Sequence, residues 1–203
     1  KDQSSNVIVV TSFNPGSGKS FLTMNIAISL AIKNKKVLVI DGDLRHASAS
    51  AYIHSPKIGL SNYLGGQIDK LSNEQHPSFS FIPVGTIPPN PTELLFDDRL
   101  QKAIHTLKQQ YDVVLIDCPP VELVADTQII EKLADRTVFV VRAGLLERSM
   151  LPELENIYRE KKYKNMSVIL NGTEGSGGRY GYRYGYQYGY GSGSYYGNND
   201  RSK

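Results

Sequence analysis

The sequence predicts an α/β fold with three layers, in which a mostly parallel sheet is covered by helices on both faces. Four short apolar, β-branched runs are continuous rather than alternating, which is typical of strands buried on both faces. Segments with apolar residues at helical spacing lie between them, and strands that alternate with helices indicate βαβ units. The 203 residues suffice for one such domain and a tail.

The strands and helices are predicted as follows. The clearest strands are VIVVTS, VLVID, VVLID and TVFVVRA at 7–12, 37–41, 113–117 and 137–143, with a fifth at 166–171 and a weaker sixth at 79–84. Helices are predicted over 21–34, 97–110, 125–134 and 151–162. In the second helix, Leu100, Ile104 and Leu107 share one stripe, which we expect to face the core.

Composition excludes several classes of protein. The net charge is +3, and the residues from Gly175 onward account for all of it, so the body is near neutral, which argues against nucleic-acid binding. A single cysteine, Cys118, excludes an internal disulfide and suits a reducing compartment. No apolar run approaches the length of a transmembrane helix. The chain starts without methionine, so we expect a fragment of a longer protein.

The pattern of strands and helices ends after Asn171. We predict a body over 1–172 and a flexible tail over 173–203, because glycine-rich sequence without aliphatic residues has no core to bury. Tyrosine alternates with other residues here, which indicates either a strand or successive modification sites. A low-complexity linker that self-associates or contacts RNA is the alternative. The tyrosines are Tyr180, Tyr182, Tyr184, Tyr186, Tyr188, Tyr190, Tyr195 and Tyr196.

The segment FNPGSGKS at 13–20, between a strand and a helix, predicts a phosphate-binding loop. Gly16 and Gly18 let the backbone approach phosphates, Lys19 can reach the β and γ oxygens, and the Ser20 hydroxyl can bind Mg²⁺. Phe13 stands where the common GxxxxGK[ST] pattern has its first glycine, so this is a variant loop; an ordinary glycine-rich turn is the alternative. The candidate nucleotide-binding residues are Pro15, Gly16, Ser17, Gly18, Lys19, Ser20 and Phe21.

Three aspartates follow predicted strands. Asp41 and Asp43 end VLVIDGD, and Asp117 ends VVLID. The carboxyl ends of parallel strands meet at one edge, where ligands bind, so we expect these carboxylates beside the loop. With Ser20, Asp41 and Asp117 suit Mg²⁺, and Asp43 is then left to accept a tyrosine proton. Any one of them could instead cap the next turn.

Together these motifs resemble the bacterial tyrosine kinases of capsule and exopolysaccharide export. The resemblance rests on NPGSGKS, VLVIDGDLR, VVLIDCPP and the terminal tyrosines, and extends to GLSNYLGG, GTIPPNPTELL and LADRTVFVVRAG. It implies a P-loop NTPase fold, with Lys19, Ser20 and Asp117 in the Walker motifs and Asp41 and Asp43 in an additional one. Asn171 would touch the adenine. Asn14 stands where partition ATPases carry a second lysine.

The resemblance also implies a function and partners. The chain would be an ATP- and Mg²⁺-dependent tyrosine autokinase that phosphorylates its tail tyrosines between subunits and regulates polysaccharide synthesis and export. Expected partners are further copies of the chain, forming a ring in the parent protein, a transmembrane activator or upstream membrane domain, the export machinery and a tyrosine phosphatase, without nucleic acid. We expect it at the cytoplasmic side of the inner or plasma membrane.

Two alternatives remain open. The first is a partition or positioning ATPase that hydrolyses ATP and dimerises; Asn14, Asp43 and the tyrosine tail weigh against it. The second is a nucleotide-binding adaptor phosphorylated by another kinase; the complete set of Lys19, Ser20 and the three aspartates weighs against it.

Overall fold

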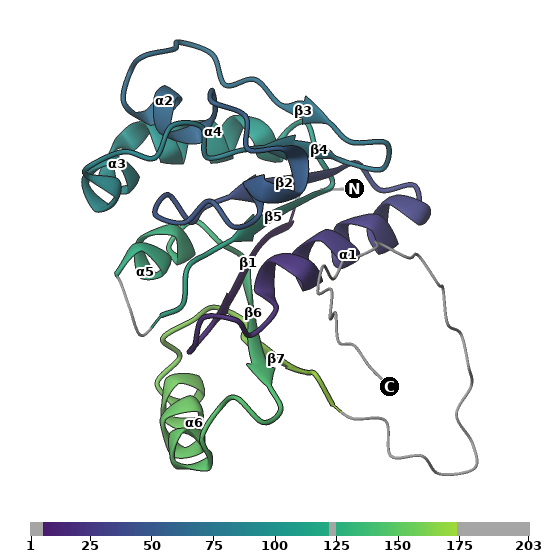
Figure 1. Cartoon of the computed structure of the whole chain (residues 1–203), viewed down its shortest axis with the longest axis vertical. Coiled ribbons are helices and arrows are strands. Elements are labelled where there is room, and N and C mark those ends of the chain that lie inside the picture. Colours follow the sequence, from purple (N-terminus) through teal and green to yellow (C-terminus); the bar gives the residue numbers. More distant parts are fainter. Residues whose placement is uncertain (1–5, 122–124, 174–203) are drawn as a thin grey trace, which may run out of the picture. The chain divides into compact units, whose positions relative to one another are not determined.

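The computed structural model describes residues 6–121 and 125–173. Its single sheet has seven strands in the order β3-β4-β2-β5-β1-β6-β7 (Figure 1). All neighbouring pairs run parallel except β3 and β4. The strands are β1 (Asn6–Ser12), β2 (Val37–Asp41), β3 (Glu74–Gln75), β4 (Ser80–Ile82), β5 (Val113–Asp117), β6 (Arg136–Arg142) and β7 (Ser167–Asn171). The predicted α/β class with a mostly parallel sheet is confirmed.

The helices include the four that were predicted. The first has the predicted length but begins two residues earlier, and the other three are shorter than expected. These four helices are α1 (Lys19–Ile32), α4 (Asp98–Lys108), α5 (Asp126–Glu131) and α6 (Leu151–Arg159). Two further helices, α2 (Leu60–Leu64) and α3 (Pro91–Phe96), and two 3₁₀ turns, η1 (Ser50–Ile53) and η2 (Arg148–Met150), were not predicted. Segments of this length show too little periodicity to be recognised.

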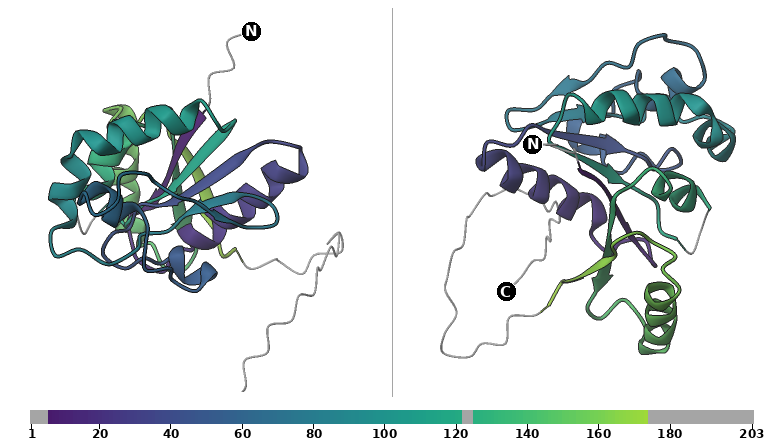
Figure 2. Two further views of the ribbon diagram at one scale, coloured as in Figure 1. Left: turned by 90° about the horizontal axis from the view of Figure 1, so that it is seen from above. Right: turned by 180° about the vertical axis from the view of Figure 1, so that it is seen from behind.

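Helices cover both faces of the sheet, which explains the continuous apolar runs (Figures 1 and 2). In β2, Leu38 and Ile40 belong to the core cluster under α2–α5, whereas Val37 and Val39 belong to the cluster under α1. Successive side chains of a strand point to opposite faces, so both sets must be apolar. Leu100 and Ile104 of α4 are buried, as the predicted stripe requires.

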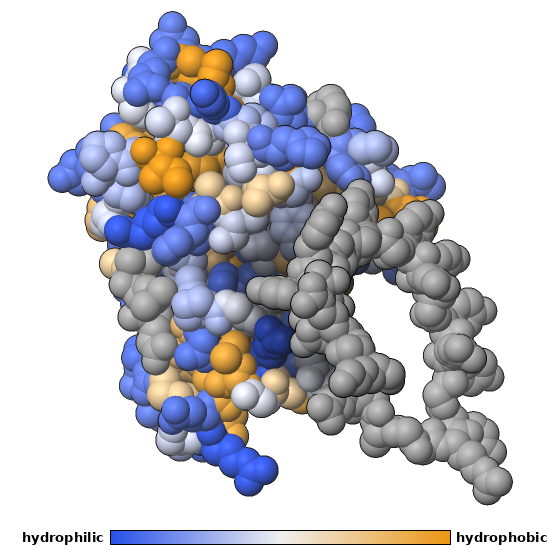
Figure 3. Space-filling view, viewed as in Figure 1, coloured by the Kyte–Doolittle hydropathy of each residue, from blue (hydrophilic) through white to orange (hydrophobic). Residues whose placement is uncertain are grey.

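Exposed apolar side chains are scattered over the face seen in Figure 3, which is otherwise mostly hydrophilic. Within the described ranges, no helix combines the length and the apolar character needed to cross a bilayer. The predicted tail, apart from Thr173, lies outside the described residues, so its disorder and its eight acceptor tyrosines stay predictions.

The strand register decides which side chains meet at the carboxyl edge of the sheet. Asp41 at the end of β2 pairs with Asp117 at the end of β5, and Asp117 pairs with Val10 in β1. On the other side of β1, Arg142 of β6 pairs with Asn171 of β7. The loop after β1 therefore begins between the acidic strand ends and the Arg142–Asn171 pair.

Candidate active site

The glycine-rich loop has the backbone conformation of a cradle. Gly16 and Gly18 have φ angles of 72° and 90°, in the left-handed region that other residues avoid. Phe13 is not in that region and needs no glycine; its buried ring packs edge-on against Phe139, with the ring centroids 4.9 Å apart. Phe13, at the variant first position of the loop, is therefore part of the hydrophobic core cluster under α6.

Two side chains from the neighbouring strands hold this loop by its carbonyl groups. Arg142 Nη1 donates to the Gly16 carbonyl at 2.8 Å, and Asn171 Nδ2 donates to the Ser17 carbonyl at 2.9 Å. A Cβ at Gly18 would lie 2.3 Å from Asn171 Nδ2, so close approach is a second reason for glycine there. The structure thus places Asn171 against the loop; its predicted contact with adenine stays a prediction.

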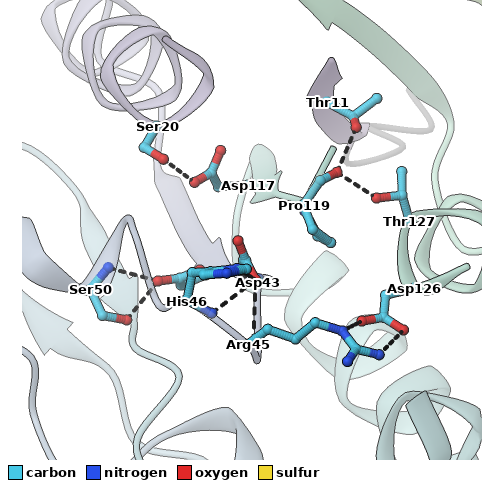
Figure 4. A network of polar contacts seen from close by, with 11 residues as sticks. Thr11, Ser20, Asp43, Arg45, His46, Ser50, Asp117, Pro119, Asp126 and Thr127 are labelled. Carbon is cyan, nitrogen blue, oxygen red and sulfur yellow. Dashed lines mark hydrogen bonds and ion pairs between the residues drawn. The ribbon is translucent and has the colours of Figure 1, made fainter. Parts of the chain in front are cut away.

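Ser20 and Asp117 are joined by a hydrogen bond, and a metal ion bound here would contact both side chains. The Ser20 hydroxyl donates to Asp117 Oδ2 at 2.5 Å (Figure 4). The Thr23 hydroxyl lies 3.4 Å from the other oxygen of Asp117. Burial, and secondly the Asp41 charge, raise the pKa of Asp117 to about 7, although the Ser20 hydrogen bond opposes this. Burial lowers the pKa of Lys19, and the charges of Asp117 and Asp43 oppose that shift.

The neighbouring Cys118 is fully buried in the core cluster under α2–α5. Its backbone N–H donates to the Val10 carbonyl at 2.9 Å. Burial first, and then the charge of Asp117, raise the pKa of its thiol well above the usual value. The thiol is therefore a packing group at this edge.

Asp41 is held by Ser50, a residue that no sequence motif indicated. The Ser50 backbone N–H and hydroxyl both donate to Asp41 Oδ2 at 2.7 Å, and the Asp43 N–H donates to Oδ1 at 3.1 Å. Burial nevertheless raises the pKa of Asp41 to about 6. The Ser50 hydroxyl also accepts from the Val84 N–H at 2.9 Å, which ties the turn after β2 to the end of β4.

Asp43 is oriented through one carboxylate oxygen only. Its Oδ1 accepts the backbone N–H groups of Arg45 at 3.2 Å and His46 at 3.1 Å, and His46 Nδ1 lies 3.4 Å from the same oxygen. Oδ2 accepts no hydrogen bond from any described residue. Asp43 is 5% exposed. A buried carboxylate with one fixed and one open oxygen suits a proton acceptor.

The segment that carries Asp43 is anchored by its arginine. Arg45 Nε lies 2.9 Å from Asp126 Oδ2 (Figure 4). Arg45 Nη2 also donates to the Thr92 hydroxyl at 2.9 Å. That hydroxyl donates to Asp126 Oδ1 at 2.7 Å, and Asp126 is fully buried. Arg45 is thus committed to a structural ion pair that joins the turn after β2 to α3 and α5.

The residues fit Mg²⁺ bound together with a nucleotide. Among the described residues, no group of three or more His, Cys, Asp or Glu side chains converges as a metal site. Mg²⁺ normally takes one or two carboxylates and completes its shell with phosphate oxygens and water. Ser20, Asp117 and Asp41 lie at the start of α1 and at adjacent strand ends, which is the arrangement such a shared site needs.

Comparison with known proteins places the chain in a family. Residues 6–163 match the family model described as ATPase MipZ, so the body belongs to this family of ATPases. The tyrosine-protein kinase CpsD of Streptococcus agalactiae is 33% identical over 180 residues, which cover 86% of this chain and 79% of CpsD. The chain belongs to the bacterial tyrosine kinases.

Other bacterial tyrosine kinases agree with this assignment. The putative tyrosine-protein kinase EpsB of Ralstonia solanacearum is 38% identical over 90% of this chain, although the match spans only 25% of EpsB. The kinase domain of Escherichia coli tyrosine kinase ETK superposes with a TM-score of 0.79 at 31% identity, covering 92% of this chain and 74% of that kinase-domain chain.

The fold also extends beyond the kinases. The septum site-determining protein MinD of Pyrococcus horikoshii, solved with Mg-ADP, has a TM-score of 0.66 and 25% identity and covers 82% of this chain and 70% of its own. The predicted P-loop NTPase fold is confirmed by these structures.

Proposed function

We propose that this chain is the catalytic part of a protein-tyrosine kinase that uses ATP and Mg²⁺ to phosphorylate the tyrosines at 180–196, between subunits. The observation that carries the proposal is Asp43. It adds a third carboxylate, with an open oxygen, beside the two that a P-loop ATPase uses for its metal ion. The named relatives CpsD and EpsB support the same activity.

Each residue of the edge has a defined task in this proposal. The backbone N–H groups of the loop and the start of α1 bind phosphate, and Lys19 reaches the β and γ oxygens. Ser20, Asp117 and Asp41 would hold Mg²⁺, which neutralises phosphate charge during transfer. The neighbouring structure of MinD was solved with Mg-ADP, which supports the binding of Mg²⁺ together with an adenine nucleotide. Metal binding would also keep both carboxylates ionised despite their raised pKa values.

Asp43 acts on the incoming tyrosine. The tyrosine oxygen forms a bond to the γ-phosphorus as the bond from that phosphorus to the bridging oxygen of ADP breaks. The phenolic proton moves to Asp43 Oδ2, the oxygen that accepts no other hydrogen bond from a described residue. Since free tyrosine has a pKa near ~10, a positioned base is needed at neutral pH.

We also propose where the parent protein lies in the cell and which partners it has. Because the match spans a quarter of EpsB, we infer that further segments place the catalytic part at the cytoplasmic side of a membrane. The proposed partners are other copies in a ring, a transmembrane activator, the polysaccharide export machinery and a tyrosine phosphatase.

Mass spectrometry after incubation with Mg·ATP tests the proposal. We expect phosphate on several of the tail tyrosines in the unaltered chain and none in Lys19→Met. The match to the ATPase MipZ model gives the second candidate, an ATPase without kinase activity. Steady ATP hydrolysis with no phosphotyrosine, in this chain and in a version extended upstream, would select that candidate and reject the kinase.

A further inference from the structure

The end of the sheet opposite the phosphate loop is a continuous surface made by the loops that lead into four parallel strands. This amino-end surface consists of residues 33–36, 108–112, 131–136 and 160–166, before β2, β5, β6 and β7. The Asp112 N–H donates to the Lys36 carbonyl at 2.9 Å, and Asn165 Nδ2 donates to the Asp135 carbonyl at 2.8 Å. Lys164 Nζ donates to the Lys132 carbonyl at 2.6 Å. The ion pair of Lys108 with Asp135, at 3.0 Å, connects these two pairs of loops, so the four loops form one connected surface.

This surface concentrates positive charge. It carries nine lysine and arginine side chains against four carboxylates, a net charge of +5, whereas the whole chain has only +3. The rest of the chain therefore has a net charge of −2, and the charge is polarised along the strands. Among the described residues of this surface, seven exposed cations have no carboxylate within ion-pair distance: Lys33, Lys35, Lys36, Lys132, Arg136, Lys161 and Lys164. Lys164 instead donates to backbone carbonyls.

Helix dipoles account for only part of this charge. Helices of a parallel α/β fold end at the amino edge, and cations near their C-termini are stabilising within the last turn. Lys33 directly follows α1 and fits that explanation. Lys35 and Lys36 lie farther beyond the end of α1, and Arg136 is the first residue of β6. Because the helix dipoles do not explain these cations, we expect them to bind an anionic ligand outside the chain.

We propose that the amino-end surface binds the surface of an anionic lipid bilayer. Clusters of several lysine and arginine side chains are attracted to anionic headgroups. Ile32, 77% exposed, ends α1 beside Lys33 and supplies an apolar side chain of the kind that enters the interfacial region. Single-stranded nucleic acid normally needs several exposed rings for base stacking. Tyr163 of this surface is buried and Tyr111 is half-buried, and Tyr158 beside Lys161 is a single exposed ring, so the many cations and few rings favour lipid headgroups.

Binding in this orientation would leave the candidate active site open. The phosphate loop and the three aspartates are at the carboxyl edge, at the opposite end of the strands. Binding of lipid by this surface does not require kinase activity.

Sedimentation of the full chain with lipid vesicles tests this inference. One set of vesicles contains about one third phosphatidylglycerol in phosphatidylcholine, and the other is pure phosphatidylcholine, both at about 0.1 M salt. The test variant is Lys33→Gln/Lys35→Gln/Lys36→Gln. The matched control, Lys57→Gln/Lys70→Gln/Lys102→Gln, removes the same charge from exposed sites outside the surface. Both variants keep the basic tail.

We expect the test variant to bind anionic vesicles at least about tenfold more weakly than the unaltered chain, and the control to change little. A second triple variant, Lys132→Gln/Arg136→Gln/Lys161→Gln, should show the same loss, and Ile32→Ser a smaller one. Thermal unfolding curves establish that the variants are folded. Equal losses in the test and control variants, or equal binding to both vesicle types, would overturn the proposal. So would unchanged vesicle binding with reduced retention of short duplex DNA, which would assign the surface to nucleic acid.

Discussion

At the scale of single residues, Asp43 differs from the other two aspartates in having an open oxygen. Replacement by Asn keeps the size of the side chain and its acceptor oxygen but removes its capacity to take a proton. We expect Asp43→Asn to lower the rate of tyrosine phosphorylation by roughly 10²–10⁴-fold. Binding of a fluorescent ATP analogue should be nearly unchanged, because Asp43 is not among the proposed metal ligands.

Asp69→Asn is the matched control, because this exposed carboxylate lies outside the candidate site. It should leave both phosphorylation and nucleotide binding unaltered. If Asp43→Asn phosphorylated the tail as fast as the unaltered chain, Asp43 would not be the base.

The buried carboxylates make a prediction about pH and stability. Asp41 and Asp117 have pKa values raised to about 6 and about 7, so the folded protein binds their protons more tightly than the unfolded chain. Their contribution to stability is therefore largest below the unfolded pKa and is lost as pH rises toward 7. Asp117→Asn removes this penalty, and without nucleotide it should be more stable than the unaltered chain at pH ~8, by on the order of 1–4 kcal/mol.

Thermal unfolding of both proteins across about pH 5 to 8 measures this effect. The stability advantage of Asp117→Asn should shrink as the pH falls, because the aspartate then becomes neutral as well. A difference in Tm that stays constant across the range would show that Asp117 is already ionised in the folded protein.

The sequence alone predicted the residues of the candidate site, but it did not predict the residues that hold them in position. The loop and the strand-end aspartates were predictable because fixed spacing and strand ends place them together. Ser50 and Asp126 were not, because their contacts with Asp41 and Arg45 arise from turns whose path local patterns do not determine. The contact of Arg142 with the Gly16 carbonyl was not predictable either, because it depends on β6 lying beside β1.

At the scale of elements, the ion pair of Arg45 connects three segments. Arg45→Met would leave the fully buried Asp126 with only the Thr92 hydroxyl as a side-chain partner among the described residues. We expect a loss of stability of roughly 1–3 kcal/mol. We also expect slower phosphorylation, because the turn that carries Asp43 loses its anchor.

Urea unfolding of Arg45→Met beside Arg148→Met measures the loss. Arg148 is exposed and forms no ion pair with a described residue, so its replacement should cost little. Adding Asp126→Asn to Arg45→Met should restore part of the stability, since the buried charge is then gone. Equal unfolding midpoints for the two single variants would contradict a role for the pair.

At the scale of the whole molecule, the sequence predicted the layers of the fold, but it did not predict the edge strand β3 or the short helices α2 and α3. Continuous apolar runs such as VLVID indicate burial on both faces, and the two core clusters confirm it. The antiparallel edge strand β3 has two residues, too few for any pattern. α2 and α3 are positioned by their packing on α4 and α5 rather than by periodicity.

The rate at which a reagent labels the buried thiol of Cys118 measures how often the protein unfolds. A thiol reagent needs both access and the thiolate, and the fold withholds both from the one cysteine of the chain. Labelling in native buffer should therefore proceed only through unfolding of the central sheet, at a single rate far below that in urea. Mg·ATP should slow it further by mass action if it binds only the folded chain.

Intact mass spectrometry during labelling follows this rate directly. Rapid labelling that Mg·ATP does not slow would show that the edge around Asp117 opens without global unfolding. Otherwise the thiol of Cys118, next to the proposed metal ligand Asp117, reports how often the whole core unfolds and how strongly a bound nucleotide opposes that unfolding.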